Sequence, residues 1–110
     1  MKQEAVQSTR ALLARLRAEF EELYGERLVK MLLYGSRARG DAAVDSDTDV
    51  LVVLTGPVRP MEEIERTGET VANISLEFNE VISCVFVDQS DFASRNTPLL
   101  RNVRKEGVPV

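Results

Sequence analysis

The feature that most constrains the fold is an unbroken run of five apolar residues at positions 50–54. A strand with one side in water would alternate apolar and polar residues, so a continuous run indicates a strand buried on both faces. Two more apolar runs, at residues 28–34 and 81–87, are also predicted to be strands. A buried central strand requires helices or loops to cover it, which favours an α/β domain.

Two long segments carry apolar residues at helical spacing. In residues 3–24 the expected buried face consists of Val6, Leu13, Leu16, Phe20 and Leu23. In residues 60–78 it consists of Met61, Ile64, Val71 and Phe78. Gly25 is expected to end the first helix, and Gly68 weakens the second by about 1 kcal/mol relative to Ala. Two short helices should follow the third strand, and Thr97, Pro98 and Gly107 mark the cap, first position and end of the second.

The predicted order is helix, strand, turn, strand, helix, strand, helix. Because a helix joins the second and third strands, they should be parallel neighbours with a right-handed crossover. The expected fold class is α/β, in a two-layer α+β arrangement with a small mixed sheet of three to four strands packed with helices. A length of 110 residues suits a single domain spanning residues 1–110.

Composition excludes several classes of function. A net charge of −4 argues against strong nucleic-acid binding, which needs a basic face. With no histidine, neither a Ser-His-Asp triad nor a histidine-ligated zinc site is available, and Cys84 in its apolar run is expected to be an inert buried thiol. The chain has no apolar run of about 18 residues and no hydrophobic segment at its start, which predicts a cytoplasmic protein without a membrane span.

The chemistry concentrates between the first two strands. Asp47 and Asp49 lie two residues apart at the start of a strand, so both carboxylates should point to one face. Two such charges repel unless a cation lies between them, and carboxylate oxygens suit Mg²⁺, or Mn²⁺, with phosphate oxygens completing the coordination. Gly35, at the end of the first strand, would let a phosphate approach the backbone, and Ser36 would add a hydroxyl donor.

A phosphate cradle beside a carboxylate pair is what metal-assisted phosphoryl or nucleotidyl transfer requires. Arg37 and Arg39 would add positive charge near the leaving pyrophosphate. Each of these features alone is common: most Asp-x-Asp pairs are exposed loop carboxylates, and Gly-Ser after a strand is an ordinary turn. The combination, with ten residues between Ser36 and Asp47, is much rarer.

The stretch YGSRARGDAAVDSDTDVLVVL resembles the signature of the DNA polymerase β-type nucleotidyltransferase superfamily, and in its GSRARG and SDTD details the minimal nucleotidyltransferase (MNT) branch. The resemblance implies that Gly35 and Ser36 bind the triphosphate of ATP and that Asp47 and Asp49 bind two Mg²⁺ ions. Residue 48 is usually apolar in the family, and Thr48 departs from that pattern.

The family usually carries a third carboxylate on the strand after the second long helix. Aligning that strand, VISCVFV, places Ser83 at the position, and a serine supplies neither the charge nor a base near neutral pH. Glu80, three residues earlier, is the candidate substitute, with an ordinary exposed strand end as the alternative interpretation.

Members of the MNT branch act as antitoxins that transfer AMP from ATP to a tyrosine of a HEPN-domain toxin encoded nearby. The resemblance therefore implies an antitoxin nucleotidyltransferase whose acceptor is held by a partner or by a second copy of the chain. One alternative is a catalytically inactive binding module that neutralises a HEPN partner by contact, which the serine at position 83 favours. Another is a nucleotidyltransferase that acts on a small molecule.

Overall fold

The computed structural model describes residues 2–40 and 47–110, and side chains from residue 8 onward. Residues 41–46, which belong to the turn expected between the first two strands, and the side chain of Val6 lie outside this part of the chain. The elements, in order, are α1 (Lys2–Tyr24), the 3-10 turn η1 (Gly25–Arg27), β1 (Leu28–Tyr34), α2 (Ser36–Arg39), β2 (Thr48–Leu54), α3 (Pro60–Phe78), β3 (Ile82–Asp88), α4 (Gln89–Ser94), α5 (Pro98–Glu106) and β4 (Val108–Pro109).

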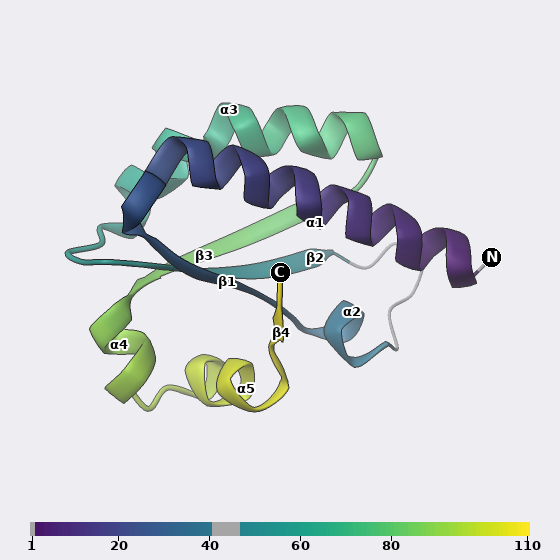
Figure 1. Cartoon of the computed structure of the whole chain (residues 1–110). Helices are drawn as coiled ribbons and strands as arrows, with labels where there is room; N and C mark the ends of the chain where they lie inside the picture. Colours follow the sequence, from purple (N-terminus) through teal and green to yellow (C-terminus); the bar gives the residue numbers. More distant parts are fainter. Residues whose placement is uncertain (1, 41–46) are drawn as a thin grey trace.

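The four strands form one mixed sheet in the order β3-β2-β1-β4. β2 and β3 are parallel, as the connecting helix predicts, whereas β1 is antiparallel to both β2 and β4. Helices α1 and α3 cover one face, and α4 and α5 lie on the other (Figure 1). The predicted α/β class with a mixed sheet is confirmed. The sequence predicts two layers, one sheet and one layer of helices, and α4 and α5 add a third, smaller layer on the other face of the sheet (Figure 1).

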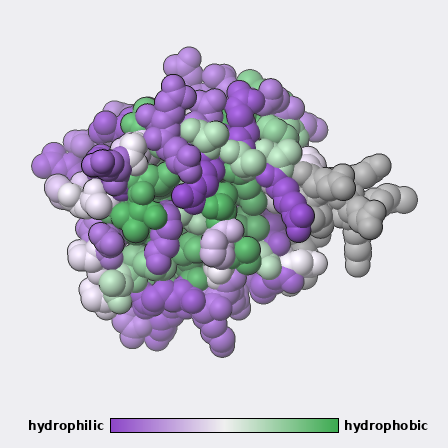
Figure 2. Space-filling model, viewed as in Figure 1, coloured by the Kyte–Doolittle hydropathy of each residue, from purple (hydrophilic) through white to green (hydrophobic). Residues whose placement is uncertain are grey.

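β2 is the central strand and is buried on both faces, as its apolar run predicts. Val50, Val52 and Leu54 belong to the core beneath α1 and α3. Leu51 and Val53, on the alternate face, pack in the second core with Phe92, Leu100 and Val103 of α4 and α5. On the face shown in Figure 2, apolar side chains are visible between more hydrophilic layers above and below. None of the helices in the described part of the chain is long and apolar enough to cross a bilayer.

The buried face expected for α3 is wrong at its N-terminal half. Met61 and Ile64 are 69% and 48% exposed, and the helix instead turns Glu63, Thr67 and Ile74 inward. Similarly, in α1 Leu23 is 43% exposed while its neighbour Tyr24 is buried. The periodicity of apolar residues alone missed this rotation because part of the buried face of α3 is polar.

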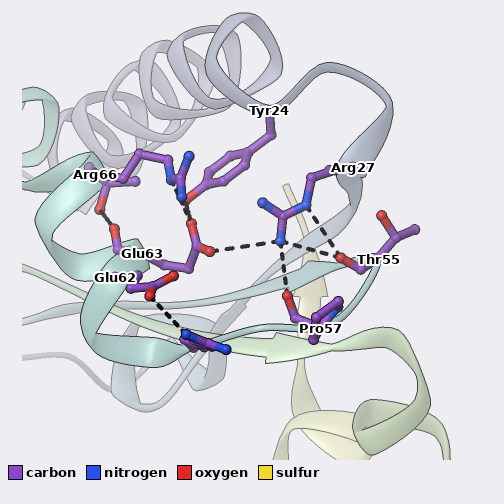
Figure 3. A network of polar contacts seen from close by, with 9 residues as sticks. Tyr24, Arg27, Thr55, Pro57, Glu62, Glu63 and Arg66 are labelled. Atoms are coloured by element: carbon purple, nitrogen blue, oxygen red, sulfur yellow. Dashed lines mark hydrogen bonds and ion pairs between the residues drawn. The ribbon is translucent and has the colours of Figure 1, made fainter.

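A buried carboxylate explains the orientation of α3. Tyr24 Oη and Arg66 Nε donate to Glu63 Oε1 over 2.8 and 3.0 Å, and Arg27 Nη2 lies 3.7 Å from Glu63 Oε2 (Figure 3). Burial, and then the bond to Glu63, raise the pKa of Tyr24. Because a buried charge is tolerated only when it is paired, this network fixes the start of α3 against the end of α1.

The C-terminal segment follows the predicted punctuation. Thr97 caps α5 by accepting a hydrogen bond from Leu100 N, Pro98 is its first residue, and Gly107 follows it. The short strand β4, which the sequence pattern does not predict, then pairs with Leu32 and Leu33 of β1. The predicted strand at 81–87 lies one residue later in the structure, and the strand predicted at 50–54 begins two residues earlier, at Thr48.

Candidate functional site

The end of β1 and the starts of β2 and β3 lie at the same end of the sheet (Figure 1). β1 ends at Tyr34, opposite Asp49 of β2, and Gly35 turns the chain into α2 with φ 77° and ψ −157°. A Cβ built on Gly35 would stand 2.6 Å from Asp49 Oδ2. Only glycine therefore fits here, both for its positive φ and for its contact with the carboxylate.

The two carboxylates of the Asp-x-Asp pair lie at the entry to β2. Asp47 precedes β2 and is exposed, while Asp49 is half-buried within the strand. Burial, and then the negative charge of Asp47, raise the pKa of the Asp49 carboxyl. The two groups are therefore close enough to repel each other, and a divalent cation bound by both would relieve that repulsion.

The position across from Asp49 on β3 is occupied by a hydroxyl. In the parallel ladder Asp49 is registered with Ser83, so the two side chains leave the same face of the sheet. Position 83 is where the family resemblance leads us to expect the third carboxylate, and a serine lies there instead. Among the described residues, no group of three or more His, Cys, Asp or Glu side chains could hold a metal ion.

Glu80 is not beside Asp49. Thr48 Oγ1 donates to Glu80 Oε2 over 2.9 Å, and Arg37 Nη2 lies 3.7 Å from the same oxygen. Thr48 is fully buried and alternates with Asp49, so it faces the α1–α3 layer. To substitute for the third carboxylate, Glu80 would have to lie on the α4–α5 face of the sheet, where Asp49 is. Its bond to Thr48 places it on the α1–α3 face instead. The alternative of an ordinary exposed strand end is not what the structure shows either, because this side chain is mostly buried.

Arg37 and Arg39 both have acidic neighbours. The Arg37 side chain contacts Glu80 and is only 9% exposed. Arg39 Nη1 lies 3.6 Å from Glu106 Oε2 of α5. Arg37 thus joins the start of α2 to the entry of β3, next to Gly35 and Ser36.

Tyr34 is a residue of this site to which the sequence pattern assigns no role. It is half-buried, pairs with Asp49 across the β1–β2 ladder and belongs to the α4–α5 side of the sheet. Burial, followed by the charges of Asp49 and Cys84, raises its pKa. Burial also raises the pKa of the Cys84 thiol to about 12, which fits the inert thiol that the sequence predicts.

Comparison with known proteins identifies relatives of the chain. Residues 13–99 match the family model described as a nucleotidyltransferase domain. A protein of Methanocaldococcus jannaschii, provisionally named a protein adenylyltransferase, is 32% identical over 85 residues, covering 76% of this chain and 79% of the relative.

Solved structures share the fold. A protein of Sulfolobus solfataricus, provisionally named a nucleotidyltransferase, superposes with a TM-score of 0.63 at 21% identity, covering 96% of this chain and 84% of the other. A toxin–antitoxin complex with AMP-PNP gives 0.58 at 18% identity, covering 84% and 67%. A variant of the toxin–antitoxin MntA–HpeT gives 0.54 at 15% identity, covering 99% and 71%.

Proposed function

The chain belongs to the nucleotidyltransferase domain family, and from that premise we propose that it transfers AMP from ATP to a hydroxyl group of a partner protein. The observation that carries this proposal is the contact between Gly35 and Asp49. It joins the backbone turn that would receive a triphosphate to the carboxylate that would hold its metal ion. Under this proposal the phosphate cradle and the cation site would be adjacent, as nucleotidyl transfer requires.

Asp47 and Asp49 would hold Mg²⁺. The fit rests on their chemistry, since carboxylates are hard oxygen ligands. Burial, and then the charge of Asp47, raise the pKa of Asp49, and a bound cation would offset both effects. When bound, the ion would neutralise charge on the triphosphate and polarise the phosphorus that is attacked. Because Gly35 has no side chain, the Asp49 carboxylate lies close to its backbone, and Ser36 has a hydroxyl that can donate to a phosphate oxygen.

The acceptor side of the reaction is less complete within this chain. Attack requires the acceptor hydroxyl to lose its proton, and Ser83, next to Asp49, is not a base near neutral pH. The Glu80 carboxylate is held by Thr48 and Arg37 instead of facing Asp49. We assign Glu80 to positioning the start of α2 and leave proton removal to a group of the partner or to solvent.

The proposed partner is a HEPN-domain toxin, and the modified group is a tyrosine hydroxyl. Support comes from the named function of the Methanocaldococcus jannaschii relative and from the fold shared with toxin–antitoxin proteins. Under this proposal the chain is an antitoxin that inactivates its partner by AMP transfer.

A second function is favoured by the Asp49–Ser83 pair. Because the position that neighbours Asp49 lacks a carboxylate, the chain could bind the nucleotide and neutralise its partner by contact alone. The two functions differ in whether a covalent bond to AMP forms.

The test combines the purified chain, the proposed HEPN-type partner and ATP labelled at the α-phosphate. Label on the partner that requires Asp47 and Asp49 supports transfer. A stable complex without label, formed equally well by Asp47→Asn/Asp49→Asn, supports neutralisation by contact. Failure of the partner to associate at all would refute both functions.

A further inference from the structure

The open edge of the sheet carries an apolar groove. Within the described strands, β3 is hydrogen-bonded only to β2, so half of its backbone groups point outward. Beside this edge α3 and β3 enclose a groove of about 350 Å³. Its lining includes Ile64, Gly68, Ala72, Ile82, Cys84 and Phe86.

A row of exposed apolar or small residues on α3 extends the groove. Met61, Ile64 and Leu76 are 69%, 48% and 81% exposed, and Gly68 and Ala72 continue the same helical spacing between them. Solvent-facing positions of a helix are normally polar, so a row of this length indicates a surface that another chain covers.

The surroundings of the groove are acidic. Residues 67–94, which include most of α3, all of β3 and α4, contain five Asp or Glu residues and no Lys or Arg. Three of these acids, Glu77, Glu80 and Asp91, pair with arginines outside the stretch, so the negative charge beside the groove rests on the exposed glutamates of α3. Glu65 and Glu69 lie exposed on α3 along the row. A ligand that is itself acidic would be repelled here, and one with Lys or Arg beside its apolar residues would be attracted.

The same edge is next to the candidate site. Ser83 belongs to β3 and is registered with Asp49 on β2. A strand added to the outer edge of β3 would therefore lie one strand spacing, about 4.8 Å, from Ser83 and two from Asp49. A hydroxyl on that added strand could then approach a nucleotide bound at Asp49.

From these observations we propose that the α3–β3 groove is the docking surface for an extended, basic segment of the acceptor protein, which adds to β3 as a further strand. Backbone hydrogen bonds to β3 provide affinity and alternate apolar side chains fill the groove. The Lys or Arg side chains between them are attracted by the negative charge that Glu65 and Glu69 place near the groove. This inference rests on the proposed function insofar as it concerns the acceptor. A second copy of the chain is disfavoured, because a two-fold pairing along β3 would bring acidic stretches together.

The test uses a fluorescent peptide, as long as β3, that alternates valine with lysine around a central tyrosine. A control peptide replaces each lysine with glutamate. The protein variant is Gly68→Arg, which fills and reverses the charge of the groove; a Cβ at Gly68 meets nothing within 4 Å, so the helix tolerates it. Asn73→Arg, on an exposed position of α3 outside the groove lining, makes the same charge change and is the matched control.

By fluorescence anisotropy, the lysine peptide should bind wild type and Asn73→Arg, with affinity falling as salt rises. Gly68→Arg should weaken it at least about tenfold. The Asp47→Asn/Asp49→Asn variant should bind the lysine peptide with the same affinity as wild type. Unlike wild type, it should not transfer label from α-labelled ATP to the tyrosine of the peptide. The two measurements therefore separate failure of docking from failure of catalysis. Equal binding of both peptides, no binding of the lysine peptide, or unchanged affinity in Gly68→Arg would overturn the proposal. Self-association of wild type that Gly68→Arg abolishes would assign the groove to a second copy instead.

Discussion

Gly35 and Asp49 are packed so closely that a single methyl group on Gly35 would stand 2.6 Å from Asp49 Oδ2. The glycine ends one strand and the aspartate lies near the start of the next, so the contact joins the turn between them to the sheet. The close approach therefore leaves no room for a side chain at position 35 while the Asp49 carboxylate keeps its place.

Gly35→Ala is therefore expected to abolish binding of Mg²⁺–ATP, because the new methyl group displaces the Asp49 carboxylate. The variant also carries the cost of a positive φ, about 1–2 kcal/mol. Gly40→Ala is the matched control, since Gly40 has φ 80° and a Cβ there meets nothing within 4 Å. Isothermal titration with a non-hydrolysable ATP analogue should show loss in the first variant only. Equal affinity in the two variants would refute the cradle assignment.

Asp49→Asn should stabilise the metal-free protein at neutral pH, because burial and the charge of Asp47 disfavour the ionised carboxyl. The sign follows from linkage: a carboxyl with a raised folded-state pKa destabilises the fold fully above that pKa and not at all below its ordinary value. The gain should thus shrink as pH falls through this window, as followed by denaturant unfolding with EDTA present. A gain that is constant with pH would contradict it.

With Mg²⁺–ATP added, wild type should become more stable than the variants that lack the carboxylates. A ligand that binds only the folded state raises the melting temperature of wild type. Asp47→Asn/Asp49→Asn should lose this rise, measured by differential scanning fluorimetry. A rise of equal size in the double variant would place the nucleotide elsewhere.

Glu80→Ala should lower the free energy of unfolding by about 1–3 kcal/mol, since the buried Thr48 hydroxyl and the Arg37 guanidinium lose an acceptor. In the Thr48→Val background the same change should cost less, and the difference measures the coupling between the two groups. If Glu80 were the catalytic base, Glu80→Gln would remove AMP transfer while ATP affinity and stability stayed unchanged. That result would contradict the positioning role.

Ser83→Asp should place a third carboxylate beside Asp49. Without metal the added charge should destabilise the protein, and Mg²⁺ should restore much of the loss. Transfer from labelled ATP should increase if the missing carboxylate limits the wild type. Ser83→Asn, of similar size but uncharged, controls for packing. Equal responses of both variants to Mg²⁺ would show that residue 83 does not face the ion.

Much of this architecture follows from local pattern. The unbroken apolar run of β2 predicts a central strand, and the helix between β2 and β3 predicts their parallel pairing. That pairing registers Ser83 with Asp49, at the position where the family resemblance leads us to expect a third carboxylate.

Other features depend on tertiary contacts that periodicity does not report. Met61 and Ile64 face solvent because Glu63 is held inside by Tyr24, Arg66 and Arg27. The sequence predicts the position of Glu80 at the entry of β3 but not its face, because its partner Thr48 points away from Asp49. The strand β4 has only two residues, too few to show a pattern.

Because the sheet is mixed, its strands pair over loops of different length, and the two parts of the candidate site can form at different stages of folding. β1 and β2 are consecutive antiparallel strands, so the contact between Gly35 and Asp49 closes only a short loop. Ser83 and Glu80 arrive on β3, whose parallel pairing with β2 must first close over the whole of α3. Longer loops cost more entropy, and non-local pairings form more slowly. The part of the candidate site built from β1 and β2 can therefore form early in folding, whereas the part on β3 forms only after α3 has brought β3 beside β2.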